Sequence, residues 1–255
     1  MRLNSLETGS GPPVVLLHGL FGAARNFGAL QRALSPVFRV IALDARNHGA
    51  SPHAAGMRYE TLAADVLETL DALSVAGAAV IGHSMGGKTA MRLALLAPER
   101  VPRLLIADIA PVPYRHGNTS VAAALRALPL CPGLTRAGAE AALTAAVPDA
   151  AVRAFLIQNL QFGPPPRWRI GLADIAAAIP DLEGWETPPG TYSGPTLFVS
   201  GARSDYVLPE HRPMIRALFP AARFLSIKNA GHWLHADNPA GFLSVVEAFL
   251  HGWKG

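Results

Sequence analysis

One serine of this chain lies in a setting that can make a hydroxyl group nucleophilic. Ser84 is flanked by Gly82 and Gly86 in the pentapeptide GHSMG, after an apolar run at 78–81 and before a helical pattern at 84–96. A strand that reverses into a helix this quickly needs glycine beside its apex, because a Cβ would collide with the neighbouring backbone. The pattern therefore predicts a strained turn that exposes the Ser84 hydroxyl at a helix N-terminus, where backbone N–H groups favour a developing oxyanion.

A serine nucleophile needs a general base, and His232 has the most suitable position among the nine histidines. It follows the last apolar run, 223–227, and precedes the last helical pattern, 239–250. The position also comes late in the chain order Ser, Asp, His that accompanies this kind of turn. We expect His232 to accept the Ser84 proton and to return it to the leaving group.

A third residue should hold the imidazole and stabilise its charged form, and two carboxylates qualify. Asp108 ends an apolar run at 103–107, and Asp205 comes shortly after another at 196–200. Both follow the end of an expected strand, so the spacing leaves the two alternatives open.

An oxyanion hole needs two backbone N–H donors that point to one place. Met85, directly after the nucleophile, is expected to supply one of them. The glycine-flanked loop His18-Gly19-Leu20-Phe21-Gly22 follows an early apolar run and is expected to supply the other, from either Leu20 or Phe21. A polar segment at 44–51 is expected to form a hydrogen-bonded turn that braces this loop. No grouping of His, Cys and carboxylates has the spacing of a metal site.

These residues need elements that bring them to one edge of a sheet. Short apolar runs alternate with helical patterns at 59–73, 84–96 and 239–250, which predicts a mostly parallel sheet flanked by helices. The alternation breaks between 111 and 194, where the chain is helical, alanine-rich and then proline-rich. We expect a core domain of residues 1–111 and 194–255, with an inserted helical cap, 112–193, over the strand ends.

Composition limits the other possibilities. The chain has 255 residues, 50% of them hydrophobic, and its net charge of +4 comes from scattered basic residues, so we expect no nucleic-acid partner. The single cysteine, Cys131, excludes an intramolecular disulfide. Neither a membrane-spanning stretch nor an apolar leader is evident, which favours a cytoplasmic protein without membrane partners; homo-oligomers stay possible.

Together these motifs resemble the α/β-hydrolase superfamily and, more narrowly, the YbfF-type bacterial esterases. The resemblance extends from Val14 to the last helix; its more specific matches lie around Asp44 and Asp108, whereas the cap matches poorly. It implies the α/β-hydrolase fold, with Ser84 as nucleophile, His232 as base and Asp108 as acid, and places Ser204 near the histidine. It also implies hydrolysis of short-chain acyl esters or thioesters with no cofactor.

The expected activity is that of a serine carboxylesterase that works through an acyl-enzyme intermediate. The alternatives are a thioesterase, carbon–carbon bond hydrolase or perhydrolase with the same triad, and a non-catalytic ligand-binding module. The expected partner is a small acyl ester, and the side chains expected to line its pocket are Phe21, His83, Phe155, Leu160, Trp168 and Trp233.

Overall fold

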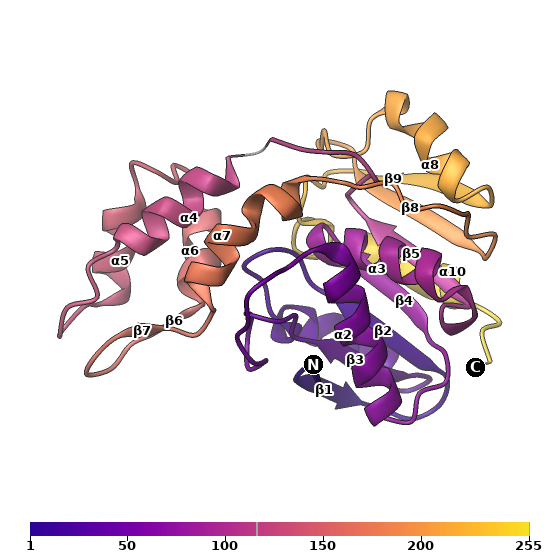
Figure 1. Ribbon diagram of the computed structural model, residues 1–255, viewed down its shortest axis with the longest axis horizontal. Helices are drawn as coiled ribbons and strands as arrows, with labels where there is room; N and C mark the ends of the chain where they lie inside the picture. The colour runs from indigo at the N-terminus through magenta and orange to yellow at the C-terminus, as the bar shows by residue number, and fades with distance from the viewer. Residues whose placement is uncertain (116, 255) are drawn as a thin grey trace.

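The computed structural model describes residues 1–115 and 117–254, and its centre is a seven-stranded sheet. The strands lie in the order β1-β3-β2-β4-β5-β8-β9 (Figure 1). All neighbouring pairs are parallel except β1 with β3. The bounds are β1 Ser5–Thr8, β2 Pro13–Leu17, β3 Arg39–Leu43, β4 Ala79–His83, β5 Arg103–Ala107, β8 Thr196–Gly201 and β9 Ala222–Ile227. The predicted fold class, a mostly parallel sheet flanked by helices, is confirmed.

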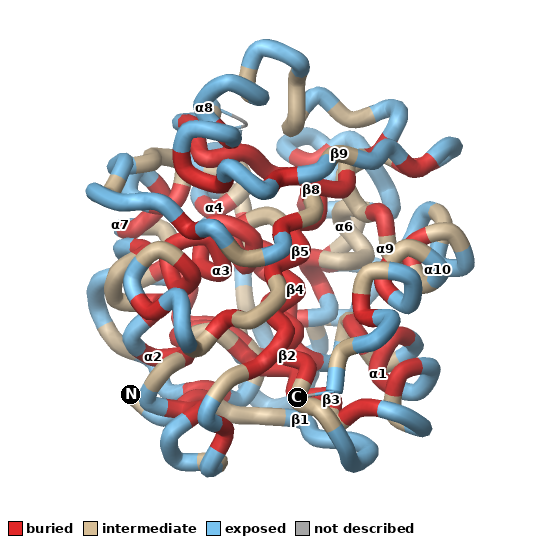
Figure 2. The backbone as a smooth tube through the Cα atoms, turned by 90° about the vertical axis from the view of Figure 1, so that its right-hand side faces the viewer, coloured by how far each residue is buried: buried red, intermediate tan, exposed pale blue. Residues whose placement is uncertain are grey.

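Helices cover both faces of the sheet because successive strand residues point to opposite sides. Val15 and Val80 face one buried cluster, whereas Val14 and Ala79 face the other. The first cluster includes residues of α2 Tyr59–Ala72, α3 Met85–Leu96 and α8 Arg212–Leu218. The second includes residues of α1 Gly28–Leu34 and α10 Pro239–Leu250. Figure 2 shows the resulting buried sheet between more exposed helices.

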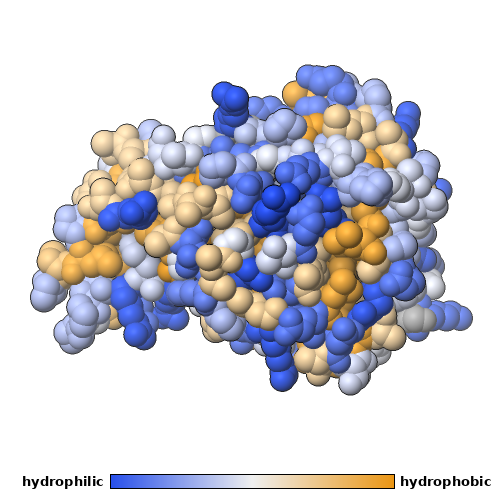
Figure 3. Space-filling view, viewed as in Figure 1, coloured by the Kyte–Doolittle hydropathy of each residue, from blue (hydrophilic) through white to orange (hydrophobic). Residues whose placement is uncertain are grey.

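The chain between β5 and β8 forms a lobe beside the end of the sheet, which is called the cap below (Figure 1). It contains α4 Asn118–Ala127, α5 Arg136–Leu143, α6 Ala150–Ile157 and α7 Leu172–Glu183, which pack around a third buried cluster. A two-stranded hairpin, β6 Leu160–Gln161 with β7 Arg167–Trp168, accompanies the helices. Figure 3 shows that hydrophilic residues gather where this lobe meets the rest of the molecule. The bounds 112–193 for an inserted cap remain a prediction.

The sequence placed α2, α3, α10 and six of the seven strands of the large sheet within about two residues of their observed ends, as is usual for such boundaries, but it gave no bounds for the helices between β5 and β8. It missed β1, an exposed edge strand of four residues, and the hairpin in the cap, whose strands have two residues each. The short remaining elements are the 3-10 turns Ala24–Phe27, Pro98–Arg100 and Pro209–His211 and the helix α9 Leu234–Asp237. None of the described helices is both long and apolar enough to span a membrane.

Candidate active site

The turn at Ser84 has the strained geometry that its glycines predict. Ser84 adopts φ 53° and ψ -120°, a conformation that a non-glycine residue seldom occupies. A Cβ at Gly82 would lie 2.3 Å from the carbonyl oxygen of Gly86, and one at Gly86 would lie 2.2 Å from that of Leu17. Only glycine therefore allows β4 to reverse into α3 at this point, with Ser84 at the apex.

Ser84, His232 and Asp108 form one chain of hydrogen bonds. The His232 Nε2 atom is 3.0 Å from the Ser84 Oγ, and its Nδ1 atom is 2.8 Å from the Asp108 Oδ2. Asp108 is fully buried and directly follows β5, with φ 55°. Its Oδ1 accepts the Gly201 N–H at 3.0 Å, and its Oδ2 also accepts the hydroxyl of Ser204. The carboxylate is thus held by the neighbouring strand β8 while it contacts the imidazole.

Asp205, the alternative acid, is placed elsewhere. Its side chain is exposed, and the described residues give it no hydrogen bond or ion pair. The two carboxylates follow adjacent strands, but Asp108 is the first residue after β5, whereas Asp205 is four residues beyond the end of β8. At the position beside His232 the chain has Ser204, which donates to Asp108. The carboxylate that bonds to His232 is therefore that of Asp108, and the alternative assignment to Asp205 is wrong.

The loop after β2 lies against the nucleophile. A Cβ at Gly19 would lie 3.2 Å from the Cβ of Ser84. The Phe21 N–H donates to the Nε2 atom of His48 at 3.1 Å, so it is not available to an oxyanion. For the Leu20 and Met85 N–H groups the described residues provide no hydrogen-bond acceptor. Of the two alternatives in this loop, the structure favours Leu20 and contradicts Phe21 as the backbone donor.

The segment after β3 braces this loop, as predicted. Asp44 accepts the Ala24 N–H through Oδ1 at 2.7 Å and the Ala50 N–H through Oδ2 at 2.9 Å. His48 donates from Nδ1 to the Arg46 carbonyl oxygen, which leaves its Nε2 as the acceptor for Phe21. Burial, assisted by the charge of nearby His18, lowers the pKa of His48 to about 3. His48 therefore stays a neutral acceptor near neutral pH.

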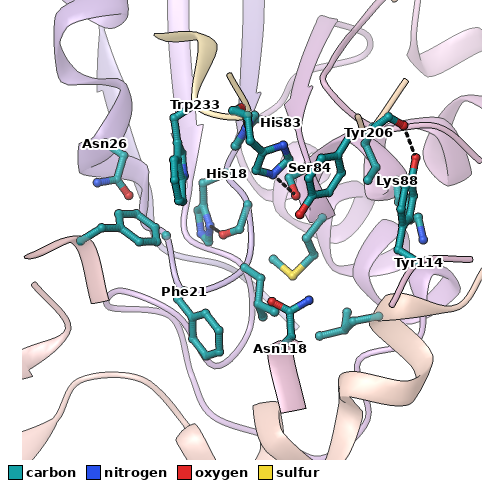
Figure 4. Close-up of a pocket in the computed structure, with 18 of the residues that line it drawn as sticks. His18, Phe21, Asn26, His83, Ser84, Lys88, Tyr114, Asn118, Tyr206 and Trp233 are labelled. Carbon is teal, nitrogen blue, oxygen red and sulfur yellow. Dashed lines mark hydrogen bonds between the residues drawn. The ribbon is translucent and has the colours of Figure 1, made fainter. Parts of the chain in front are cut away.

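A cavity of about 270 Å³ opens beside Ser84 and His232. Cap residues of α4 and α6, such as Val121 and Phe155, line it together with residues of the core. Figure 4 shows Ser84 between His18 and Tyr206, with Phe21 and Asn118 farther along the cavity. Four of the predicted substrate-binding residues line the cavity: Phe21, His83, Phe155 and Trp233.

Leu160 and Trp168, the other two residues predicted to bind substrate, lie away from the cavity. They are cross-strand partners in the β6–β7 hairpin. Leu160 is only 4% exposed within the buried cluster of the cap, and Trp168 packs against the same cluster. Their apolar character stabilises the cap, so their assignment to the pocket is corrected to a packing role.

Several polar residues of the cavity were not anticipated, and Lys88 is the most notable. It is four residues after Ser84 on a helix whose other side chains are mostly buried. Its Nζ atom donates to the Gly184 carbonyl oxygen at 2.7 Å, and burial lowers its pKa to about 7. A lysine within an apolar helical face was the available signal. Tyr59, Tyr114, Asn118 and Tyr206 also line the cavity, and no comparable sequence pattern marks them.

Within 1–115 and 117–254, no group of three or more His, Cys, Asp or Glu side chains could hold a metal ion. The arrangement that the site does contain is a hydroxyl, an imidazole and a buried carboxylate in series, beside two unbonded backbone N–H groups. Those are the components of nucleophilic acyl transfer.

Comparisons with known proteins agree with this geometry. The family described as alpha/beta hydrolase fold matches residues 12–239. The mouse sn-1-specific diacylglycerol lipase ABHD11 is 40% identical over 94% of this chain and 81% of its own length. Esterase YbfF of Escherichia coli is 38% identical over 94% of this chain and 93% of its own. A solved marine microorganism esterase has 35% identity and a TM-score of 0.95, and the match covers 98% of this chain and 100% of that one. The chain therefore belongs to the α/β-hydrolase fold family and is an enzyme of the hydrolase class.

Proposed function

We propose that this hydrolase is a serine carboxylesterase for short-chain acyl esters, with Ser84 as nucleophile, His232 as general base and Asp108 as the acid of its triad. The observation that carries the proposal is the hydrogen-bonded series Ser84 Oγ, His232 and Asp108, with distances of 3.0 and 2.8 Å. These are the separations that direct proton transfer requires. Relatives named esterase and lipase support the same reaction class.

The reaction would proceed through an acyl-enzyme. The Ser84 Oγ attacks the ester carbonyl carbon while its proton passes to the His232 Nε2, and Asp108 stabilises the resulting imidazolium through Nδ1–H. The negative carbonyl oxygen receives hydrogen bonds from the N–H groups of Leu20 and Met85. When the carbon–oxygen bond breaks, His232 gives its proton to the leaving alcohol. Water, deprotonated by His232, then releases the acid and restores Ser84.

The cavity supports a small substrate. Its volume of about 270 Å³ lies just below the usual range for sites that hold drug-sized ligands, roughly 300–1,000 Å³. Apolar side chains such as Phe155, Leu156 and Leu182 supply much of its lining, which suits an uncharged acyl chain of a few carbons. A diacylglycerol, the substrate named for the mouse relative, would need the cap to move outward if its acyl chains were long.

The direct experiment compares the wild-type enzyme with Ser84→Ala on p-nitrophenyl acetate, butyrate and decanoate, with acetyl-CoA as a thioester. We expect the wild-type enzyme to hydrolyse the acetate and butyrate esters and to hydrolyse the decanoate ester more slowly. Ser84→Ala should hydrolyse none of the three esters. A fluorophosphonate probe should label the wild-type protein at Ser84 in a one-to-one ratio. Undiminished hydrolysis by Ser84→Ala would refute the nucleophile, and preference for decanoate or acetyl-CoA would refute the substrate class.

A further inference from the structure

The ring of Tyr206 lies flat against the ring of His232. Their centroids are 3.8 Å apart and their planes differ by 18°. His83 and Trp233 also contact the imidazole, at 4.8 and 5.9 Å, but with planes tilted by 43° and 62°. Among the described aromatic residues, Tyr206 therefore makes the face-to-face contact with the imidazole that bonds Ser84.

Hydrogen bonds hold the backbone of Tyr206 on both sides. Its N–H donates to the Ser204 Oγ at 3.3 Å, and that hydroxyl in turn donates to Asp108. Its carbonyl oxygen accepts the Tyr114 hydroxyl at 2.5 Å, and the Tyr114 oxygen accepts the Ala110 N–H at 2.8 Å. Tyr206 is thus tied at two points to the segment 108–110, which carries the carboxylate bonded to His232. Figure 4 shows the bond between Tyr114 and Tyr206.

We propose that Tyr206 is a positioning residue for the reaction: its ring face fixes the plane of the His232 imidazole and stabilises the imidazolium that forms when Ser84 loses its proton. The face of an aromatic ring carries partial negative charge, which attracts a cation placed over it. The contribution increases as the proton moves from the Ser84 Oγ to the His232 Nε2, so it acts on the transition state. The inference rests on the proposed function.

The other described groups that face His232 make different contacts with it. Asp108, from the end of β5, holds Nδ1, and Ser84 faces Nε2. His83, on β4, donates from Nε2 to the His232 carbonyl oxygen at 2.8 Å, and burial lowers its pKa well below the usual 6.5. Burial likewise lowers the pKa of His235, on α9, to about 4. Burial raises the pKa of Tyr206 to about 12, and nearby Asp205 adds to that, so its ring stays a neutral phenol.

The test compares Tyr206→Phe, which keeps the ring face, with Tyr206→Leu, which removes it. The readouts are kcat and KM for p-nitrophenyl acetate from pH 5 to 9. We expect Tyr206→Phe to stay within about twofold of wild type and Tyr206→Leu to lose about tenfold in kcat with little change in KM. The acidic limb of the kcat/KM profile should move to lower pH by about half a unit in Tyr206→Leu, because the imidazolium has lost a stabilising contact.

A second variant tests how Tyr206 is held. Tyr114→Phe removes the hydroxyl that bridges Tyr206 and Ala110, so we expect a smaller loss of kcat, about threefold. Thermal unfolding identifies any variant that fails to fold. If Tyr206→Leu fails to fold, Tyr206→Met takes its place. Wild-type kcat and pH profile in the ringless variant, or an equal loss in Tyr206→Phe, would overturn the inference. These outcomes are separate from those that would refute the proposed function, which are undiminished hydrolysis by Ser84→Ala and a preference for decanoate or acetyl-CoA.

Discussion

The Nζ atom of Lys88 lies 2.7 Å from the carbonyl oxygen of Gly184, so the helix after Ser84 is bonded directly to the end of cap helix α7. Lys88 is only 1% exposed, and its Nζ atom lies 5.5 and 4.9 Å from the ring centroids of Tyr59 and Tyr114. Cations are favoured at a helix C-terminus and over aromatic faces. Burial opposes the charge and dominates, which lowers the pKa of Lys88 to about 7.

Because Lys88 is buried, we expect it to make the free energy of unfolding depend on pH, and we expect Lys88→Met to remove that dependence. Between pH 7 and its ordinary pKa of 10.5, Lys88 is protonated in the unfolded chain but largely not in the folded one. The free energy of unfolding should therefore rise with pH in this range, by at most about 1.4 kcal/mol per pH unit from this group. Lys88→Met should lack this contribution. Urea unfolding of both proteins at pH 6, 7.5 and 9 measures it as the difference between their free energies of unfolding. The exposed Lys228→Met is the control, and a wild-type-minus-Lys88→Met difference independent of pH would contradict the prediction.

His48 should control the oxyanion loop without touching the substrate. His48→Ala removes the acceptor for the Phe21 N–H, so the loop 18–22, which we propose supplies the Leu20 N–H to the oxyanion, loses its brace. We expect kcat for p-nitrophenyl acetate to fall about 10- to 100-fold with a nearly unchanged KM, since loss of one oxyanion donor costs up to about 10³. The exposed His53→Ala should match the wild-type enzyme. Steady-state kinetics would contradict this bracing role if both histidine variants kept full kcat.

The parts of the site that could be predicted from the sequence are those set by local geometry. Ser84 is fixed by glycines that its own turn requires, and His232 by its place between the last strand and the last helix. Both depend on a few neighbouring residues and on the rule that parallel strands end at one edge of the sheet. The brace at 44–51 was predictable for the same reason, because a dense polar turn beside that edge must bond to something.

The parts that could not be predicted depend on distant contacts. Asp108 and Asp205 both follow strands, and the contact with His232 depends on how the side chains beyond β5 and β8 are directed. The choice between Leu20 and Phe21 rested on His48, which lies 27 residues after Phe21. Phe155, Leu160 and Trp168 are equally apolar residues of the cap, and only its packing separates the cavity lining from the cap core.

Phe155 and Trp168 offer a direct test of that separation. Phe155 lines the cavity and lies 6.0 Å from Trp233, ring centroid to ring centroid, so Phe155→Ala should enlarge the space for the substrate. We expect the ratio of kcat/KM for p-nitrophenyl butyrate over acetate to change by at least about threefold, a modest effect typical of one apolar contact. Trp168→Ala should lower the melting temperature and leave the ratio unaltered. If the ratio changed in Trp168→Ala but not in Phe155→Ala, the assignment of Phe155 to the cavity lining and of Trp168 to the core of the cap would be wrong.

The two aspartates give the sharpest test of the triad. Asp108→Asn keeps the shape of the side chain but removes the charge that would stabilise the His232 imidazolium, and it disturbs the tautomer that places a lone pair on Nε2. We expect kcat to fall about 10³- to 10⁴-fold, as for equivalent changes in serine hydrolases. The same change at exposed Asp205 should leave kcat within about twofold of wild type, because its carboxylate makes no bond to the imidazole among the described residues. Kinetics on p-nitrophenyl acetate at pH 8 compares the two directly. A severe loss in Asp205→Asn together with an active Asp108→Asn would reverse the assignment, since only a carboxylate that contacts the imidazole can account for so large an effect.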